Sequence, residues 1–390
     1  MKKLVSVLTA MVLVSTLWGQ NSVKPVNQST STNGIYYSLP QTIVQVEIKV
    51  KKEAFYAGPL AEYADDFLGK SDVKTSDETS WSIVEVSLST ATQPDPDQFY
   101  FVEFNPEELK ESRRFLMSLN ESGILQTVNS SVEQKSKKST STIVEAENEA
   151  VNKDNLFNYH AVQPRQLVKD TVIRMVTVDT SVKRDITINT KWVDKSEKEI
   201  AAEVAQRIQK IHQDRYYLSI GYQETPYDEG AIKYMDKNLI KRQEEYQALF
   251  TGKTVTSYEE YHFDWVPSKQ KDNITQKTLC KFSVRSGIRP ANSSIGLPVT
   301  LQAADENTTM QLQNHATRMK NTSKEKKGVY YRMPDFAKMS VLYDGEEVLN
   351  QRIRVNQFGV VSYAPWTRDM NFQLHPESGA LKNIELIFRD

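Results

Sequence analysis

The 390-residue chain has little of the material from which redox, metal or nucleic-acid sites are built. A single cysteine, Cys280, excludes an intramolecular disulfide, and its place on the apolar face of a predicted strand favours a buried, unreactive thiol. The five histidines are scattered, with no pair at the spacing of zinc ligands. Basic and acidic residues number 49 and 50, so no basic excess is available to neutralise nucleic-acid phosphates.

Catalytic motifs are also missing. The sequence contains no His-Glu-x-x-His zinc motif, no Gly-x-Ser-x-Gly nucleophile elbow, no phosphate-binding Gly-x-x-x-x-Gly-Lys-Ser/Thr loop and no Asp-x-Asp-x-Asp-Gly calcium loop. We therefore predict no catalytic residue, no metal ligand and no cofactor. Glycosidases and some esterases assemble their sites from distant residues, so an unrecognised hydrolase stays open as a third alternative.

Long apolar runs are absent except at the start of the chain, where residues 1–19 follow the pattern of a cleavable signal peptide. Lys2 and Lys3 precede an uncharged, apolar stretch that ends at Trp18, and small and polar residues follow from Gly19. The stretch of about 15 apolar residues is shorter than the roughly 20 needed to cross a bilayer. We expect export, cleavage between Gly19 and Gln20, and no transmembrane segment in the mature chain.

Strand and turn signals predict an α+β protein of mainly antiparallel β units. Residues 42–50 alternate apolar and polar side chains, which is the period of a strand with one buried face. The Pro94–Asp97 segment predicts a turn between two shorter strands. Asp344 and Gly345 lie between apolar runs and are typical of a tight hairpin turn.

Changes in composition divide the chain into predicted regions. Stretches rich in Ser, Thr, Asn, Glu and Lys predict a loose tail and a linker, because they carry too few apolar residues to form a core. The regions are a disordered tail over 20–33, an N-terminal α+β unit over 34–130, a polar linker or loop over 131–157, a central β unit over 158–327 and a C-terminal β unit over 328–390.

The strongest local signal is a pair of amphipathic helices over 196–250, inserted in the central unit. Apolar residues recur on one face from Ile200 to Ile211, and Ser196 and Glu199 are spaced to form a capping box. A short loop joins the two helices, which predicts an antiparallel hairpin. The hairpin could be an arm that binds a partner, but we favour a helical layer packed on neighbouring sheets. Six side chains are expected to be buried: Ile200, Val204, Ile208, Ile232, Met235 and Leu239.

One candidate site lies on a predicted strand. Glu260, His262 and Asp264 alternate with aromatic residues and therefore share one face of the strand. Two carboxylates and an imidazole could bind a metal ion or transfer a proton. Alternating polar residues are equally typical of a strand whose outer face meets solvent, and we favour this second interpretation.

The other candidate site is a group of tyrosines around the loop of the helical hairpin. Tyr222 and Tyr227 are the candidates for ligand binding, because aromatic rings in an exposed loop could stack on sugars. We favour the alternative that these tyrosines anchor the ends of the helices to a sheet. The group comprises Tyr216, Tyr217, Tyr222, Tyr227 and Tyr234.

Two stretches of the chain repeat each other in order. Residues 34–40 match residues 328–334 at four positions, with conservative exchanges at two more. The segment Glu-Ser-Gly followed by an apolar pair then occurs at 121–125 and again at 377–381. A duplicated β module would explain both pairs, and so would recurring turn and strand chemistry.

These landmarks also resemble an exported family of Bacteroidetes bacteria, known as domain of unknown function 4831. The resemblance extends over nearly the whole mature chain and rests chiefly on Tyr56–Pro59, Tyr246–Gly252, Gly328–Pro334 and Gln357–Val361. It implies export in a Gram-negative bacterium, to the periplasm or the cell surface. The family has no assigned activity, so the resemblance adds no catalytic residue.

The sequence thus predicts an exported, non-catalytic scaffold or interaction protein. Its partner would be an envelope protein or a glycan, and not a nucleic acid. A glycan-binding module of the cell envelope is the alternative, and it would require several aromatic rings that lie coplanar on one exposed face.

Overall fold

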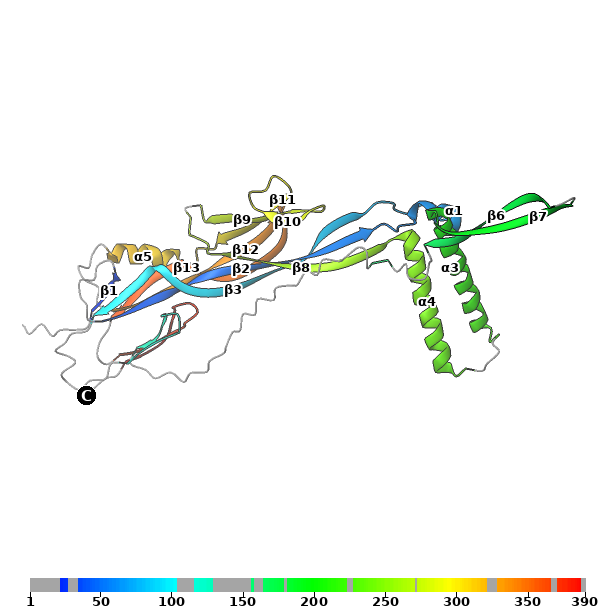
Figure 1. Cartoon of the computed structure of the whole chain (residues 1–390). Helices are drawn as coiled ribbons and strands as arrows, with labels where there is room; N and C mark the ends of the chain where they lie inside the picture. Colours follow the sequence, from blue (N-terminus) through cyan, green and yellow to red (C-terminus); the bar gives the residue numbers. More distant parts are fainter. Residues whose placement is uncertain are drawn as a thin grey trace, which may run out of the picture.

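The computed structural model describes residues 22–26, 34–103, 116–128, 156–157, 164–178, 181–222, 227–270, 272–320, 328–365 and 370–386. The predicted signal peptide lies outside these residues, as does most of the predicted tail and linker. The molecule is elongated, with a body of β-sheets at one end and two long helices near the other (Figure 1). A two-stranded hairpin projects beyond the helices.

The first sheet is built on two long strands, β2 (Gly34–Tyr56) and β3 (Glu78–Glu103), which pair antiparallel over almost their whole length. Strand β8 (Lys253–Trp265) pairs with the other edge of β2, which gives the order β1-β3-β2-β8. A short turn of helix follows β2, as η2 (Ala61–Tyr63) and α1 (Ala64–Leu68).

The second sheet has the order β10-β9-β11-β12-β13, and all its neighbours pair antiparallel. Its long hairpin turns at Asp344 and Gly345, whose positive φ angles of 51° and 85° confirm the predicted tight turn. A helix, α5 (Met310–Lys320), lies between β11 and β12 in the order of the chain. The strands are β9 (Ile274–Ser283), β10 (Gly287–Pro290), β11 (Leu297–Asp305), β12 (Gly328–Tyr343) and β13 (Glu346–Pro365).

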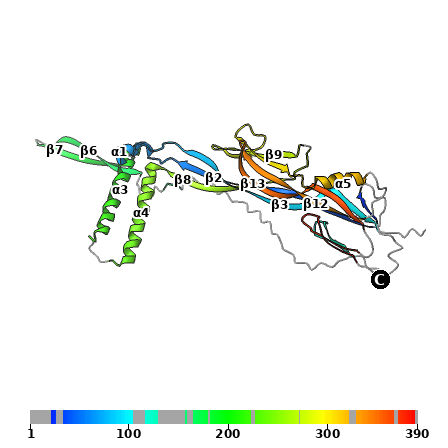
Figure 2. The same cartoon turned by 180° about the vertical axis from the view of Figure 1, so that it is seen from behind.

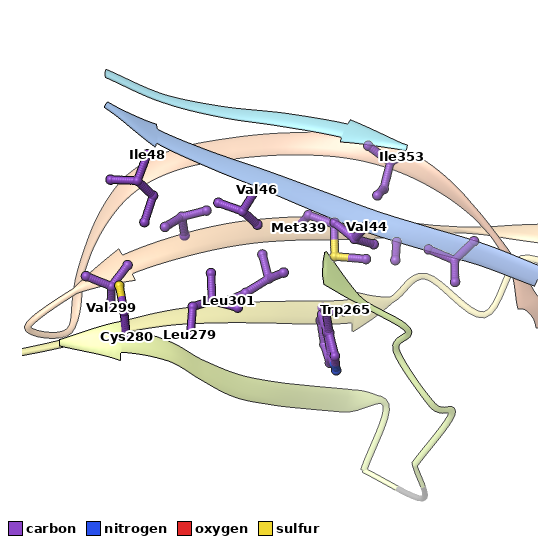
Figure 3. Close-up of a cluster of buried hydrophobic side chains, with 14 of the residues drawn as sticks. Val44, Val46, Ile48, Trp265, Leu279, Cys280, Val299, Leu301, Met339 and Ile353 are labelled. Carbon is purple, nitrogen blue, oxygen red and sulfur yellow. The ribbon is translucent and has the colours of Figure 1, made fainter. Parts of the chain in front are cut away.

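The two sheets pack face to face around the largest buried cluster (Figure 3). Val44, Val46 and Ile48 alternate along β2 on the side that meets Leu301 and Met339 of the second sheet. All five are at most 1% exposed, so this alternation forms the core of a sandwich. Cys280 lies in the same cluster, and burial raises the pKa of its thiol to about 11, which makes it unreactive at neutral pH.

A small third sheet has the order β15-β14-β5-β4 and pairs strands from residues 117–128 with the last two strands of the described chain. Its strands are β4 (Met117–Leu119), β5 (Leu125–Val128), β14 (Met370–Leu374) and β15 (Leu381–Leu386). Each short hairpin of this sheet follows a long one: β2–β3 precedes β4–β5, and β12–β13 precedes β14–β15.

The two repeated motifs occupy matching places in this arrangement. The amide of Ser38 donates to the carbonyl oxygen of Gly123 at 3.1 Å, and the amide of Arg332 donates to the carbonyl oxygen of Gly379 at 2.8 Å. Ser38 and Arg332 are the fifth residues of their motifs, and both glycines have positive φ. A shared hydrogen bond between matching residues exceeds what turn chemistry requires, and it supports duplication.

The two long helices, α3 (Glu197–Ser219) and α4 (Glu229–Thr251), form the predicted antiparallel hairpin. The predicted capping box of Ser196 and Glu199 is present, and Asp228 caps α4 by accepting from the amide of Ala231 at 2.7 Å. Of the six side chains expected to be buried, Val204 and Ile208 are, and the other four are half-buried. The fold class of α+β with mainly antiparallel sheets and an inserted helical hairpin is confirmed.

The helical hairpin does not form a layer on a sheet, in contrast to the interpretation that we favoured. Its buried cluster combines α3, α4 and α1 with Phe157, and only Tyr56 comes from a strand. Contact is confined to one end of the hairpin, where the amide of Leu60 donates to the carbonyl oxygen of Leu249 at 2.8 Å. Gly58 is needed there, because a Cβ on it would lie 2.3 Å from the same oxygen.

Two other predictions are wrong in part. Residues 22–25 of the predicted tail form strand β1 (Ser22–Pro25), which pairs with the end of β3. Backbone groups at a sheet edge accept a strand of almost any composition, so local sequence did not reveal it. The Pro94–Asp97 segment does not end a strand. It lies within β3, at a bulge where the register against β2 shifts between Ser38 and Pro40.

The hairpin of β6 (Arg165–Val178) and β7 (Ser181–Asp194) forms a two-stranded sheet of its own. It leads directly into α3 and projects from the end of the molecule, as both views show (Figures 1 and 2). The predicted division into three β units stays a prediction. Of the predicted linker, only Leu156 and Phe157 are described, and they pack against the helices.

Candidate functional site

The free end of the helical hairpin carries the group of tyrosines that the sequence singled out. We call Tyr216, Tyr217, Tyr222, Tyr227 and Tyr234 the tyrosine tip. All five are exposed, and Tyr222 and Tyr234 expose 74% and 70% of their surface. Ile220 lies among them and is 54% exposed, so apolar surface is concentrated at this end of the protein.

The burial pattern of the two helices explains why the tip is exposed. The buried residues of α3 end at Ile211, and those of α4 begin only at Ala248. Between Ile211 and Tyr246, neither helix contributes a side chain to a buried apolar cluster of the described chain. Arg215 of α3 ties them together, with Nε 2.9 Å from an oxygen of Asp236 and Nη1 3.3 Å from Oε1 of Gln243. The outer half of the hairpin is therefore held by side chains between the helices and presents its tyrosines to solvent.

The rings of the tyrosine tip do not form a flat platform. The centroids of Tyr216 and Tyr217 are 6.1 Å apart with an angle of 52° between the planes, and those of Tyr217 and Tyr222 are 5.5 Å apart at 42°. Gln213 fixes one of these rings by donating from Nε2 to the hydroxyl of Tyr217 at 2.7 Å. The tilted rings form an uneven aromatic surface and not a flat one.

The interpretation that the tyrosines anchor helix ends to a sheet is wrong. The end of α3 and the start of α4, where the tyrosines gather, lie at the end of the hairpin away from the sheets, as Figure 1 shows. The sheet-side end instead uses Leu249 and Phe250, which are fully buried. Residues 223–226 of the loop lie outside the described chain.

The second candidate group, on β8, lies on the solvent side of the first sheet. Glu260, His262 and Asp264 are exposed, while Tyr261 and Phe263 pack on the core from the opposite face. The amine of Lys49 lies 2.8 Å from Glu260, and this hydrogen bond and charge lower the pKa of that carboxyl. Gln45 donates to Asp264 at 3.2 Å.

These contacts are the cross-strand pairs of an open sheet surface. Each carboxylate has its own neighbour on β2, so the three side chains do not converge on a common point. Within the described ranges, no cluster of three or more His, Cys, Asp or Glu side chains could hold a metal ion. A ligand at Glu260, His262 and Asp264 stays a prediction, and the geometry gives it no added support.

A family model for a domain of unknown function, DUF4831, matches residues 33–171 and 180–370. The chain belongs to this family. The resemblance seen in the sequence is thereby confirmed at the level of the family. The helical hairpin lies inside the second matched segment, and the gap between the segments falls at the outer end of the β6–β7 hairpin. No curated protein and no solved structure matches the chain. In the part of the chain that the structure describes, no helix combines the length and the apolar character needed to cross a membrane.

Proposed function

We propose that this protein is an exported, non-catalytic interaction protein that binds a protein of the cell envelope through the tyrosine tip. The observation that carries the proposal is the exposure of five tyrosines and Ile220 at the end of a projecting helical pair. Tyrosine is enriched among the residues that dominate binding energy, because its large ring buries apolar area while its hydroxyl keeps a polar partner. It also loses little conformational entropy on binding.

The ring geometry favours a protein partner over a glycan. A sugar stacks on a flat aromatic face, and a glycan of several sugars needs rings that share a plane. The planes of Tyr216, Tyr217 and Tyr222 are tilted by 42° or more between neighbours. An uneven surface of tilted rings instead suits the side chains of a protein, which interdigitate at the centre of an interface.

The body of the molecule is suited to act as a scaffold for this tip. Strand β2 has 23 residues and is therefore about 75 Å long, and α3 has 23 residues and is about 35 Å long. Strand β2 ends at Tyr56, in the cluster at the base of the helices, so the tip is held at a defined distance from the sandwich. Export is supported by the charge and apolar pattern of residues 1–19.

Site-specific photocrosslinking tests the proposal. A photoreactive amino acid would replace Tyr222 in one variant and Gln206, exposed nearer the base of α3, in a matched control. We expect one defined envelope protein to crosslink at position 222 in the native host and not at 206. Tyr216→Ala with Tyr234→Ala should abolish that product without changing the melting temperature. Equal crosslinking at both positions would contradict the proposal, and so would tyrosine-dependent binding to a purified polysaccharide.

The predicted export is tested separately by the mass of the mature chain. We expect protein recovered from the envelope fraction to begin near Gln20. An intact mass that includes Met1 on envelope-located protein would rule out signal-peptide cleavage.

A further inference from the structure

The β6–β7 hairpin has an exposed apolar face that the proposed function does not use. Its register pairs Leu167 with Trp192 and Ile173 with Ile186, so each of these pairs lies on one side of the ribbon. Met175 and Ile188 lie on the same side, because side chains alternate between faces. We call these six side chains the apolar face. Each is between 46% and 63% exposed.

This face lacks a covering layer within the described residues. The three buried apolar clusters contain no side chain from β6 or β7. In the part of the chain that the structure describes, Gln166 at the base of the hairpin donates to Glu199 of α3 at 3.0 Å. Nε of Arg165 lies 2.8 Å from Asp194 and closes the base of the hairpin itself. An isolated two-stranded hairpin is marginally stable in water at best, and it becomes stable when one face packs on another element.

We propose that the apolar face packs against the same face of a second copy of this chain. A two-fold axis parallel to the strands would place β6 of one copy over β7 of the other, with both hairpins running in the same direction. Each residue of β6 would then face, in the other copy, the β7 residue with which it pairs inside its own hairpin. Leu167 would lie over Trp192 and Ile173 over Ile186, so the large apolar side chains would meet one another.

The charges on this side of the ribbon fit the same arrangement. Four charged residues with described side chains lie on it: Arg165 and Asp194, which pair with each other at the base of the hairpin, and Lys169 and Arg184 further along. By the register, Lys169 would face Thr190 of the other copy and Arg184 would face Met175. Like charges are therefore not placed opposite each other, and the long aliphatic stems of both residues add apolar contact.

The area of the face is sufficient for a reversible dimer. Six large side chains that are about half exposed would bury roughly 600 Å² per copy, or about 1,200 Å² in total, at the lower end of standard interfaces. A lipid surface fits less well, because Lys169 and Arg184 on the same side of the hairpin would enter the apolar layer with it.

Sedimentation of the full mature chain across a range of concentrations tests the proposal. We expect the mass to rise from one chain to two as concentration increases. Ile188→Glu and, separately, Ile173→Glu should each weaken dimerisation by at least about tenfold, because each dimer would bury two unpaired carboxylates. The matched control is Thr187→Glu, which adds the same charge to the opposite face of β7 and should leave the dimer unchanged.

Three outcomes would overturn the dimer. The first is a sedimentation mass of one chain at every protein concentration up to about 100 μM, since weak interfaces form in the micromolar range. The second is a dimer that Ile188→Glu and Ile173→Glu leave intact. The third is a monomer that binds vesicles of phosphatidylcholine and phosphatidylglycerol through Ile188. Far-ultraviolet circular dichroism of each variant would confirm that the body remains folded, since the hairpin lies outside every buried cluster.

Discussion

Two long antiparallel hairpins of this protein share a local pattern and differ in everything around them. In β12, Ala337, Met339 and Val341 alternate with less buried residues, and all three are fully buried against the first sheet. In β6, Ile173 and Met175 share one side of the strand, with Arg174 between them on the other side, yet they expose 57% and 62% of their surface. Alternation therefore specifies a strand with an apolar side, and a second layer decides whether that side becomes core.

The ion pairs of the two hairpins give the largest expected contrast. Arg332 on β12 is buried, donates to the carbonyl oxygen of Pro40 and pairs with Asp95, which is also buried. Arg332→Ala should cost about 3–5 kcal/mol of unfolding free energy, because it leaves the Asp95 carboxylate buried without its partner. Arg165→Ala, which removes the exposed pair with Asp194, should cost less than about 1 kcal/mol. Urea unfolding of both variants would measure this, and equal losses would break the comparison.

Apolar truncation should show the second largest difference. Met339→Ala should lower the free energy of unfolding by about 2–5 kcal/mol, because it removes a fully buried side chain and leaves a cavity. Ile173→Ala should change it by less than about 0.5 kcal/mol when measured at a dilution where the protein is monomeric. A large loss for Ile173→Ala under those conditions would mean that the same chain covers the apolar face.

A buried carboxylate in β12 makes the stability of the body depend on pH. Burial would raise the pKa of Asp335, but hydrogen bonds from Thr308 and Thr309 outweigh it and lower the pKa below its ordinary 3.8. The stabilisation is therefore complete above about pH 4 and is lost as the pH falls through the folded-state pKa. Asp335→Asn should cost about 1–3 kcal/mol at pH 7 and less at pH 2.

Acid titration of stability, with Asp264→Asn as the matched control, would measure this dependence. Asp264 is exposed and accepts one hydrogen bond from Gln45, so its substitution should leave the pH profile unchanged. A profile that Asp335→Asn does not flatten would show that other carboxylates dominate acid unfolding.

The smallest effect is expected at the tyrosine tip. Tyr222→Ala should change the melting temperature by no more than about 2 °C, because the ring is 74% exposed and lies beyond the last buried residue of α3. Ile208→Ala, on the buried side of the same helix, should lower it several times more. Calorimetry of both variants would show whether the outer half of the helical hairpin contributes to stability. A large loss of melting temperature in Tyr222→Ala would show that the tip is part of the stabilising structure.

Much of the fold could be predicted from local sequence. The capping box at Ser196, the hairpin turn at Asp344 and the alternation along β2 each depend on residues that are neighbours in the chain. Helix α5 was not predicted, because it carries few apolar residues. The turn before it is held by Asp335, which accepts a hydrogen bond from the amide of Thr309, 26 residues earlier in the chain. Local periodicity cannot report such a contact.

The candidate site was half predicted. The sequence located the tyrosines of the tip, but the anchoring interpretation failed because it assumed that large rings near a loop must be buried. Whether such rings are buried depends on which end of the hairpin packs on the rest of the protein. Here that end is the base, where Leu249 and Phe250 are buried. The exposed face of β6–β7 was not predicted either. Its residues have the same composition as core strands, and only the absence of a facing layer in the described chain distinguishes them.

The path of the chain between the helices and the sandwich determines how the molecule responds to force. Helix α4 ends at Thr251, and after one residue β8 begins and runs back along β2, from Lys253 beside Tyr56 to Trp265 beside Val44. Tension at the tyrosine tip, directed away from the sandwich, would pull β8 lengthwise along β2. The hydrogen bonds of an antiparallel ladder lie across the strands, so such a load is shared by the whole ladder at once. A protein built in this way transmits tension along its length and yields only when many bonds break together.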